Sequence, residues 1–312
     1  MTSAQYESLA AAYARARAHG ALLDLNRAQW RLSGADRVRY LNGQVTNDIR
    51  RVRSDTALAA CVTTAKGRLC GLIFVSAGPD FLRIDAEPEL RESLGARLER
   101  YIIADDVAIE DVTGQECLFH LLAPIAPSGL HEWRAANRFA LPGWDLIAPR
   151  AEHAALLAAL SAIAPLIPAP LIDTFRIEAG IPRWGAELTE ETLPPEAGLD
   201  DSAIDYHKGC YIGQEVISRI KSVGHVNRHI TGFTAAAPLT PAMTLHPEAD
   251  PAKSAGEITS AAWSFGLECW AALGYLKRGF HDAPLLARSP DGSSTPVQNR
   301  PLPLFPPLKP TL

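Results

Sequence analysis

The sequence predicts a multidomain α+β fold with a ferredoxin-like N-terminal part and a small C-terminal β-barrel. A length of 312 residues suits two or three domains. Residues 21–112 alternate between strand and helix patterns, and residues 230–276 hold short strand patterns separated by turn residues. The hydrophobic content of 47% and charged content of 21% are typical of a globular protein with a sizeable core.

Composition narrows the compartment and the classes of partner. The formal net charge of -5 gives no overall attraction to nucleic acid or to an anionic membrane. The five cysteines form no Cys-x-x-Cys pair, which indicates free thiols in a reducing compartment and no metal site. Neither a signal peptide nor a run of about 18 apolar residues is apparent. We expect a cytoplasmic protein that binds no membrane, no metal and no nucleic acid directly, and the oligomeric state stays open.

In the first third of the chain, apolar periodicity and turn residues predict the elements. Gly20 is placed to end the first helix, and Pro88 to begin the third. The expected elements are a helix over residues 4–19, strands over 21–25 and 29–32, a helix after Asp36, a hairpin of strands 57–64 and 69–76, a strand over 81–85, a helix over 88–102 and a strand over 107–112.

The rest of the chain is expected to add a second α+β part and then the barrel. The predicted elements are a helix near residues 131–137, helices over 151–163 and 171–179, a rigid loop over 193–199, a helix or strand from Gln214, and barrel strands over 230–234, 256–260 and 271–276. The tail from Thr295 holds six prolines and should be extended or mobile rather than part of a core. We place the domains at residues 1–115, 116–228 and 229–300, followed by a Pro-rich tail over 301–312.

One stretch holds more residues with special conformational or chemical requirements than any other in the chain. It reads Lys208-Gly209-Cys210-Tyr211-Ile212-Gly213-Gln214-Glu215. Two glycines flank a thiol and an aromatic ring, which implies tight backbone geometry or close approach to another surface. His207 and Lys208 precede the thiol, and their charges would favour its thiolate form. A turn with a buried structural cysteine explains the same residues equally well.

Two other segments carry groups that could bind a ligand. In the segment from Arg176 to Glu178, the carboxylate could accept paired N–H bonds from an aminopyrimidine-type ring. A charge pair on a helix surface is the favoured alternative. Lys66 and Arg68 lie in the predicted hairpin loop, where they could bind an anion or simply be solvated.

The stretch from Lys208 to Glu215 closely resembles the signature of the YgfZ family of folate-binding proteins. That family is related to the T-protein (aminomethyltransferase) of the glycine cleavage system. Segments 32–48, 65–68, 176–182 and 195–199 agree with the family in the same order. The resemblance implies a T-protein-like ring of domains around a tetrahydrofolate pocket, and the terminal strands suit the family's C-terminal barrel.

The resemblance also assigns candidate site residues. By position, Glu178 matches the glutamate that holds the pterin ring in the T-protein relatives. Cys210 would be the chemically active group, with Lys208 favouring its thiolate. The residues expected to bind tetrahydrofolate are Glu178, Asn47, Thr46, Tyr211, Lys66 and Arg68.

One departure from the T-proteins decides between two functions. Aminomethyltransferases carry an aspartate shortly after the hairpin glycine, whereas no acid follows Gly67 before Asp80. Without that carboxylate, proton transfer from folate is disfavoured. We therefore expect a tetrahydrofolate-binding accessory protein that supports assembly or repair of iron–sulfur clusters. Its partners would be cluster-assembly proteins or client enzymes, including RNA-modifying enzymes.

A folate-dependent aminomethyltransferase is the alternative function. A thiol hydrolase using Cys210 and His207 is the least favoured function, because residues adjacent in sequence rarely form a nucleophile–base pair.

Overall fold

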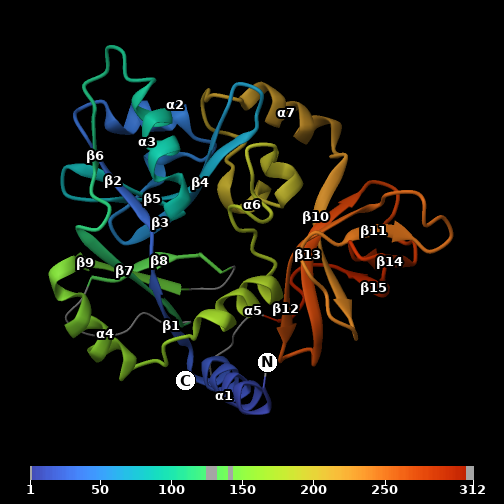
Figure 1. Cartoon of the computed structure of the whole chain (residues 1–312). Coiled ribbons are helices and arrows are strands. Elements are labelled where there is room, and N and C mark those ends of the chain that lie inside the picture. Colours follow the sequence, from blue (N-terminus) through green and yellow to red (C-terminus); the bar gives the residue numbers. More distant parts are fainter. Residues whose placement is uncertain (1, 124–131, 140–142, 307–312) are drawn as a thin grey trace.

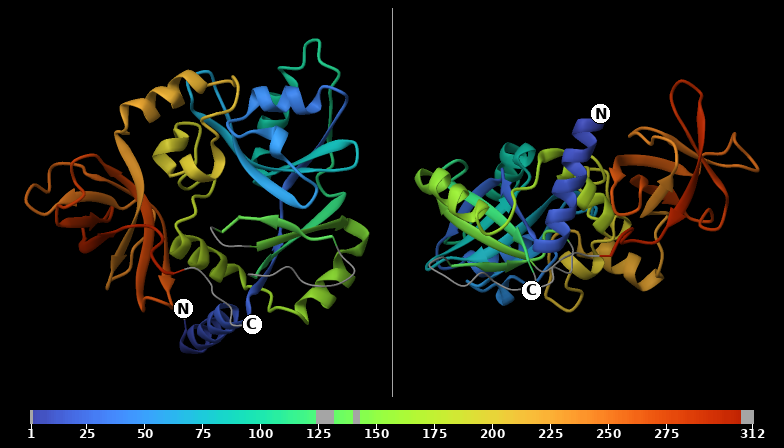
Figure 2. Two further views of the ribbon diagram at one scale, coloured as in Figure 1. Left: turned by 180° about the vertical axis from the view of Figure 1, so that it is seen from behind. Right: turned by 90° about the horizontal axis from the view of Figure 1, so that it is seen from below.

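A nine-stranded sheet and a closed six-stranded barrel form the framework of the computed structural model, which describes residues 2–123, 132–139 and 143–306. The sheet and the barrel lie on opposite sides of the molecule, with helix α5 (Ala169–Ala179) between them (Figure 1). Figure 2 shows the same separation from behind and from below. No helix in the described ranges is both long and apolar enough to cross a lipid bilayer.

The nine-stranded sheet has the order β1-β7-β9-β8-β3-β4-β5-β2-β6. All neighbouring strands are antiparallel except β3 and β8, which are parallel. The strands are β1 Ala21–Leu25, β2 Ala28–Ser33, β3 Thr56–Thr63, β4 Leu69–Ala77, β5 Phe81–Ala86, β6 Ala108–Asp111, β7 Glu116–Leu122, β8 Arg134–Ala136 and β9 Gly143–Pro149.

The predicted ferredoxin-like part is confirmed. Strand β2, helix α2 (Arg37–Gln44), strands β4 and β5, helix α3 (Arg91–Glu99) and strand β6 follow a β-α-β-β-α-β order, with β3 as an additional strand. Trp30, Leu41, Ile73, Ile84 and Leu94 are fully buried in the core of this part. Alternating burial along the strands and one apolar face on each helix explain why the sequence pattern predicted these elements.

The remaining helices lie around the sheet and between the sheet and the barrel. Thr2 caps α1 through a capping box with Gln5, and Gly180 ends α5 in the left-handed conformation. The helices are α1 Ser3–His19, α4 His153–Ser161, α6 Asp200–Ala203 and α7 Gln214–Val223, and the 3₁₀ turns are η1 Ile49–Arg51, η2 Pro88–Leu90, η3 Arg150–Glu152 and η4 Pro194–Ala197.

The predicted C-terminal barrel is confirmed, with six strands in the closed order β10-β13-β12-β11-β14-β15. Pairing between β10 and β15 closes it, with Gly232 opposite Arg300. Phe233, Leu245 and Leu276 are fully buried inside. The strands are β10 Arg228–Ala235, β11 Thr244–Pro247, β12 Gly256–Ser264, β13 Cys269–Lys277, β14 Leu285–Arg288 and β15 Ser294–Arg300.

Two expectations about local structure are wrong. The helix near residues 131–137 is not present, because residues 134–136 form β8 and residues 132 and 133 are not helical; residue 131 lies outside the described residues. The tail is not separate from the core, because Thr295 belongs to β15 and Leu304 is buried beside Ile177. Residues 307–312 lie outside the described part.

Candidate functional site

Lys208 is almost fully buried, and its ammonium group makes three hydrogen bonds with backbone carbonyls. Nζ donates to the carbonyls of Asn42 at 2.6 Å, Val45 at 2.7 Å and Asn47 at 2.7 Å. The Asn42 carbonyl is available because its helical partner, the N–H of Thr46, bonds the Cys61 carbonyl instead. Burial lowers the pKa of Lys208 to about 8, and the carboxylates of Asp48 and Asp205 limit the fall. The ammonium group of Lys208 therefore donates hydrogen bonds to backbone carbonyls at and just after the C-terminal end of α2.

Thr46 and Asn47 belong to the same buried cluster. The hydroxyl of Thr46 donates to the Ala203 carbonyl at 2.6 Å and accepts from the Cys61 N–H at 2.9 Å. The Asn47 amide donates to the Ala59 carbonyl at 2.8 Å. These bonds fasten the segment after α2 to β3 and α6, so the polar side chains serve backbone groups of the protein itself.

Cys210 is the exposed member of the five cysteines, all of which lie in described ranges. Burial raises the pKa of the other four thiols. The alternative of a buried structural cysteine at Cys210 is therefore wrong. Tyr211, the next residue, is buried, and its ring lies 5.2 Å from the Lys208 ammonium. The loop thus presents a thiol at the surface above a buried lysine and tyrosine.

The hairpin between β3 and β4 supports this loop. The Thr63 hydroxyl donates to the Ile212 carbonyl at 2.5 Å. Gly213 has a φ of +90°, and a Cβ there would lie 2.6 Å from both the Thr63 hydroxyl and the Thr64 carbonyl. Lys66 is exposed at the hairpin loop, and Arg68 pairs with Glu191. The hairpin therefore packs against the end of the signature loop, at Ile212 and Gly213.

Glu178 occupies a separate place, between α1 and the barrel. It is 2% exposed, and its two oxygens accept from the Tyr13 hydroxyl at 2.8 Å and the Ser264 hydroxyl at 2.5 Å. Burial raises the pKa of Glu178, although both hydrogen bonds oppose the rise. Arg176 is also buried, so the favoured alternative of a charge pair on the helix surface is wrong.

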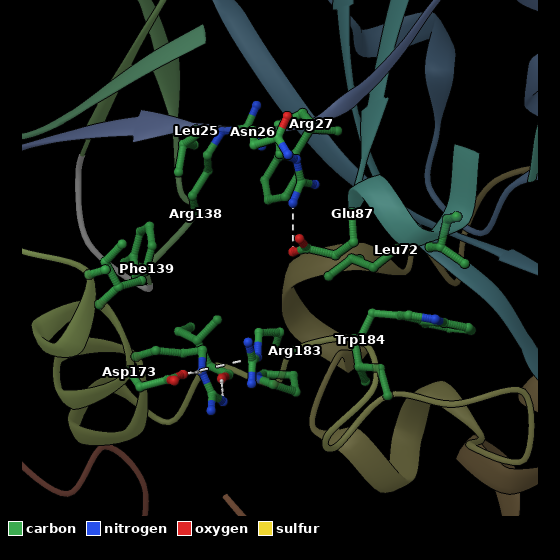
Figure 3. A pocket seen from close by; sticks show the side chains of 18 residues that line it. Leu25, Asn26, Arg27, Leu72, Glu87, Arg138, Phe139, Asp173, Arg183 and Trp184 are labelled. Carbon is green, nitrogen blue, oxygen red and sulfur yellow. Dashed lines mark hydrogen bonds and ion pairs between the residues drawn. The ribbon is translucent and has the colours of Figure 1, made fainter. Parts of the chain in front are cut away.

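A central pocket of about 310 Å³ lies between the sheet and α5. Its walls come from the β1–β2 connection, β4, η2, α5 and the loop after α5, as Figure 3 shows. Leu72, Phe74 and Trp184 provide apolar and aromatic surface. The eight residues predicted from the sequence are not among those that line this pocket.

Charged side chains stand on opposite walls of the central pocket. On one wall Arg27 pairs with Glu87 at 2.6 Å. On the other, Asp173 lies 4.0 Å from Arg183, and Figure 3 shows both contacts. The pocket can therefore offer cations and carboxylates to one ligand. Sequence reasoning missed Arg27 and Arg183; their positions in loops beside buried elements are the signal that could have indicated them.

Arg176 links the pocket to the barrel. Its Nη1 donates to the Ile181 carbonyl at 2.8 Å and to Glu187 at 2.9 Å, and its Nε donates to Asp173 at 3.0 Å. Its Nη2 is buried and has no hydrogen-bond partner in the described part of the chain. Glu187 in turn accepts from Ser260 of β12 at 2.6 Å.

The chain shares sequence with three kinds of named proteins, although no protein-family model matches it. It is 28% identical over 229 residues to the tRNA-modifying protein YgfZ of Sodalis glossinidius, covering 68% of this chain and 70% of that one. It is 26% identical over 231 residues to a mitochondrial iron–sulfur cluster assembly factor IBA57 homolog of Chaetomium globosum. The match covers 64% of this chain and 52% of that one. It is 26% identical over 275 residues, covering 80% of this chain, to a chloroplastic protein of Arabidopsis thaliana whose name provisionally calls it a transferase. The chain spans 63% of that relative's length.

The fold is that of a T-protein. The glycine cleavage system aminomethyltransferase T of Bartonella henselae superposes with a TM-score of 0.83, covering 95% of this chain and 89% of that one at 15% identity. The chain is therefore similar in sequence to YgfZ and IBA57 proteins and has the fold of a T-protein. In this YgfZ-like chain the signature loop and the central pocket are distinct places, and Glu178 lies outside both. No cluster of three or more His, Cys, Asp or Glu side chains able to hold a metal occurs among its described residues.

Proposed function

We propose that this chain is a cytoplasmic, tetrahydrofolate-binding accessory protein that supports assembly or repair of iron–sulfur clusters in client enzymes, including RNA-modifying enzymes. The observation that carries the proposal is the exposed thiol of Cys210. It lies in a loop that Lys208 holds in place through buried hydrogen bonds. The relatives named as a tRNA-modifying protein and as an iron–sulfur cluster assembly factor support this direction.

The residues of the central pocket fit tetrahydrofolate. A volume of about 310 Å³ reaches the lower end of ordinary ligand pockets. Phe74 and Trp184 offer surface for the aromatic rings, and Arg27 and Arg183 suit the carboxylates of the glutamate tail. When bound, tetrahydrofolate would supply ring amines that carry one-carbon units.

Within this proposal the signature residues have different tasks. Cys210 would contact the cluster-assembly protein or client enzyme, since its thiol faces solvent. Lys208, Thr46 and Asn47 would position that loop through their buried bonds. Lys66 lies at the adjoining hairpin, where it could meet either the folate tail or the partner.

The folate part is tested by calorimetric titration of the purified chain with tetrahydrofolate. We expect saturable binding of one tetrahydrofolate per chain, because the central pocket combines aromatic surface with cations. Folic acid in its oxidised form is the comparison ligand. Absence of heat and of tryptophan fluorescence quenching up to millimolar tetrahydrofolate would contradict this part.

The thiol part is tested in a strain that lacks the protein. We expect Cys210→Ser to leave iron–sulfur enzyme activities at the level of the deletion, because the substitution removes the exposed thiol. Cys269→Ser, which changes a partly buried thiol of the barrel, is the matched control and should restore activity. Full activity with Cys210→Ser would remove the thiol from the mechanism.

A folate-dependent aminomethyltransferase is the second candidate, and the T-protein fold is the observation that favours it. The pocket carboxylates Glu87 and Asp173 could replace the aspartate absent from the hairpin. The discriminating assay is formation of methylenetetrahydrofolate from an aminomethyl donor. No product under conditions in which a genuine T-protein turns over would exclude this candidate.

A further inference from the structure

The C-terminal barrel carries a second cavity, of about 220 Å³, which we call the barrel cavity. Four strands of the barrel contribute to its wall: Arg228 of β10, Thr244 of β11, Glu257 of β12 and Lys277 of β13. These strands lie on the far side of α5 from the nine-stranded sheet (Figure 1). We infer that the barrel cavity binds a phosphate group, either as inorganic phosphate or as a small phosphate monoester. The inference goes beyond the proposed function and is independent of it, because tetrahydrofolate carries no phosphate.

Two cations stand side by side at the barrel cavity. Arg228 and Lys277 are directly opposite each other in the antiparallel pairing of β10 and β13, which places their Cβ atoms about 5 Å apart on one face of the sheet. The guanidinium of Arg228 is held over the ring of Tyr275, 4.3 Å from its centroid. Like charges at opposite positions of two strands repel each other, so an anion beside both would stabilise the pair.

The charge of Lys277 is not balanced within the described part of the chain. Its Nζ donates to the carbonyl of Ser254 at 3.1 Å and to the hydroxyl of Ser254 at 3.2 Å, and both acceptors are neutral. Arg228, by contrast, pairs with Glu196 at 2.9 Å, whereas Lys277 has no ion-pair partner among the described residues. An ammonium has three N–H groups, so one N–H of Lys277 is left for a ligand.

Hydroxyl groups add neutral donors to the barrel cavity. The Ser254 hydroxyl accepts from Lys277, so its own O–H can donate to a ligand, and Thr244 contributes a second hydroxyl to the wall. Donors on several strands suit a tetrahedral oxyanion, whereas a carboxylate is frequently held by two parallel bonds from one arginine. The volume lies below the range of about 300–1,000 Å³ that is usual for drug-sized ligands, which indicates a small ligand.

Glu257 is an internal competitor for such a ligand. Its Oε1 lies 3.5 Å from Nη1 of Arg228, and its side chain is 53% exposed. An exposed ion pair of this kind contributes little to stability, so a phosphate can replace the carboxylate beside Arg228. Removal of the Glu257 charge should therefore strengthen phosphate binding, an effect that a purely structural role of these residues does not produce.

The first experiment titrates the purified full chain with inorganic phosphate and, separately, with glycerol 3-phosphate. Calorimetry at pH 8, where a phosphate monoester carries two negative charges, measures both affinities. We expect saturable binding of one phosphate group per chain, and the ligand that binds more tightly tells whether the cavity is built for the free ion or for an ester. No saturable binding of either ligand at millimolar concentration would overturn the inference, whether or not the chain binds tetrahydrofolate.

Three substitutions then test the geometry of the barrel cavity. Lys277→Met should weaken phosphate binding at least fivefold, and Glu257→Gln should strengthen it at least threefold, because they remove an attractive and a repulsive charge from the wall. Lys253→Met is the matched control, since Lys253 lies against the ring of Phe280 and does not line the cavity, and it should stay within about twofold. Thermal unfolding confirms that each variant is folded. Equal weakening by Lys277→Met and Lys253→Met, or unchanged or weaker binding in Glu257→Gln, would overturn the inference.

Discussion

At the residue scale, Lys208 shows how a charged side chain can be a structural group. An ammonium has three donors, and burying it is costly unless all three are satisfied. Here three carbonyls meet those donors, and they belong to the segment at and after the end of α2. The signature lysine therefore holds its loop against the segment at the end of α2.

Replacement of Lys208 should destabilise the fold. We expect Lys208→Met to lower the free energy of unfolding by about 1–3 kcal/mol, because buried carbonyls lose their partners. Urea unfolding at pH 7 measures the change. Lys66→Met is the matched control, since Lys66 is exposed, and it should stay within about 0.5 kcal/mol. Equal effects of the two substitutions would contradict the structural role.

The free energy of unfolding should also depend on pH through Lys208. Since burial lowers the pKa of Lys208 to about 8 from 10.5, the unfolded chain holds a proton that the folded chain has lost between those pH values. Stability contributed by this group therefore rises with pH across that window. The unmodified chain should gain stability there relative to Lys208→Met, and parallel pH profiles would contradict the shifted pKa.

At the element scale, the sequence was a good guide wherever one face of an element is buried. The hairpin of β3 and β4, the helix α3 and the barrel strands β10, β12 and β13 all have such a face, and each was predicted. The barrel strands β11, β14 and β15 were not predicted. Strand β8 was not, because it has three residues and its position depends on parallel pairing with β3, about eighty residues away. Composition also misled at the tail, where the leucines between the prolines fill the gap beside Gly180 and Gly232.

The candidate site was only partly predictable for a related reason. The spacing of glycines around Cys210 predicted tight backbone geometry, and Gly213 has a φ of +90°. The segment from Arg176 to Glu178 was also marked, but its pattern could not show that α1 covers Glu178 while Arg176 lines a pocket. The pocket itself combines residues such as Arg27 and Arg183 from distant segments, which only the tertiary fold brings together.

At the scale of the whole molecule, a buried charge network joins the two halves of the nine-stranded sheet. Arg138 lies between Asp85 of β5 and Asp145 of β9, at 2.7 Å and 2.8 Å. Asp145 also bonds His120 of β7 at 2.7 Å. Burial alone would raise the pKa of Asp145, but Arg138 and His120 hold it well below its usual range. The network therefore ties β5 to β7 and β9 across the sheet.

Removal of one charge from this network should destabilise the fold. We expect Asp145→Asn to lower the free energy of unfolding by about 3–5 kcal/mol at pH 7, because Arg138 loses a buried partner. Since the depressed pKa makes the carboxylate stabilising above about pH 4, the difference should shrink as the pH falls below that value. Denaturant unfolding at several pH values measures it. Asp55→Asn is the control, because Asp55 forms an exposed pair with Arg53. If Asp145→Asn and Asp55→Asn changed the free energy of unfolding equally little, the stabilising role of the buried network would be contradicted.

The strand order has a consequence for self-association. An unpaired sheet edge is a template for aggregation. The outer side of β1 is covered by the segment around Leu166, since Leu22 exchanges backbone bonds of 2.9 Å with Pro165 and Ile167. The opposite edge, β6, is four residues long and carries Glu110 and Asp111, while closure leaves the barrel without free edges. Within the described part of the chain, these features disfavour edge-to-edge polymerisation at both ends of the sheet and around the barrel.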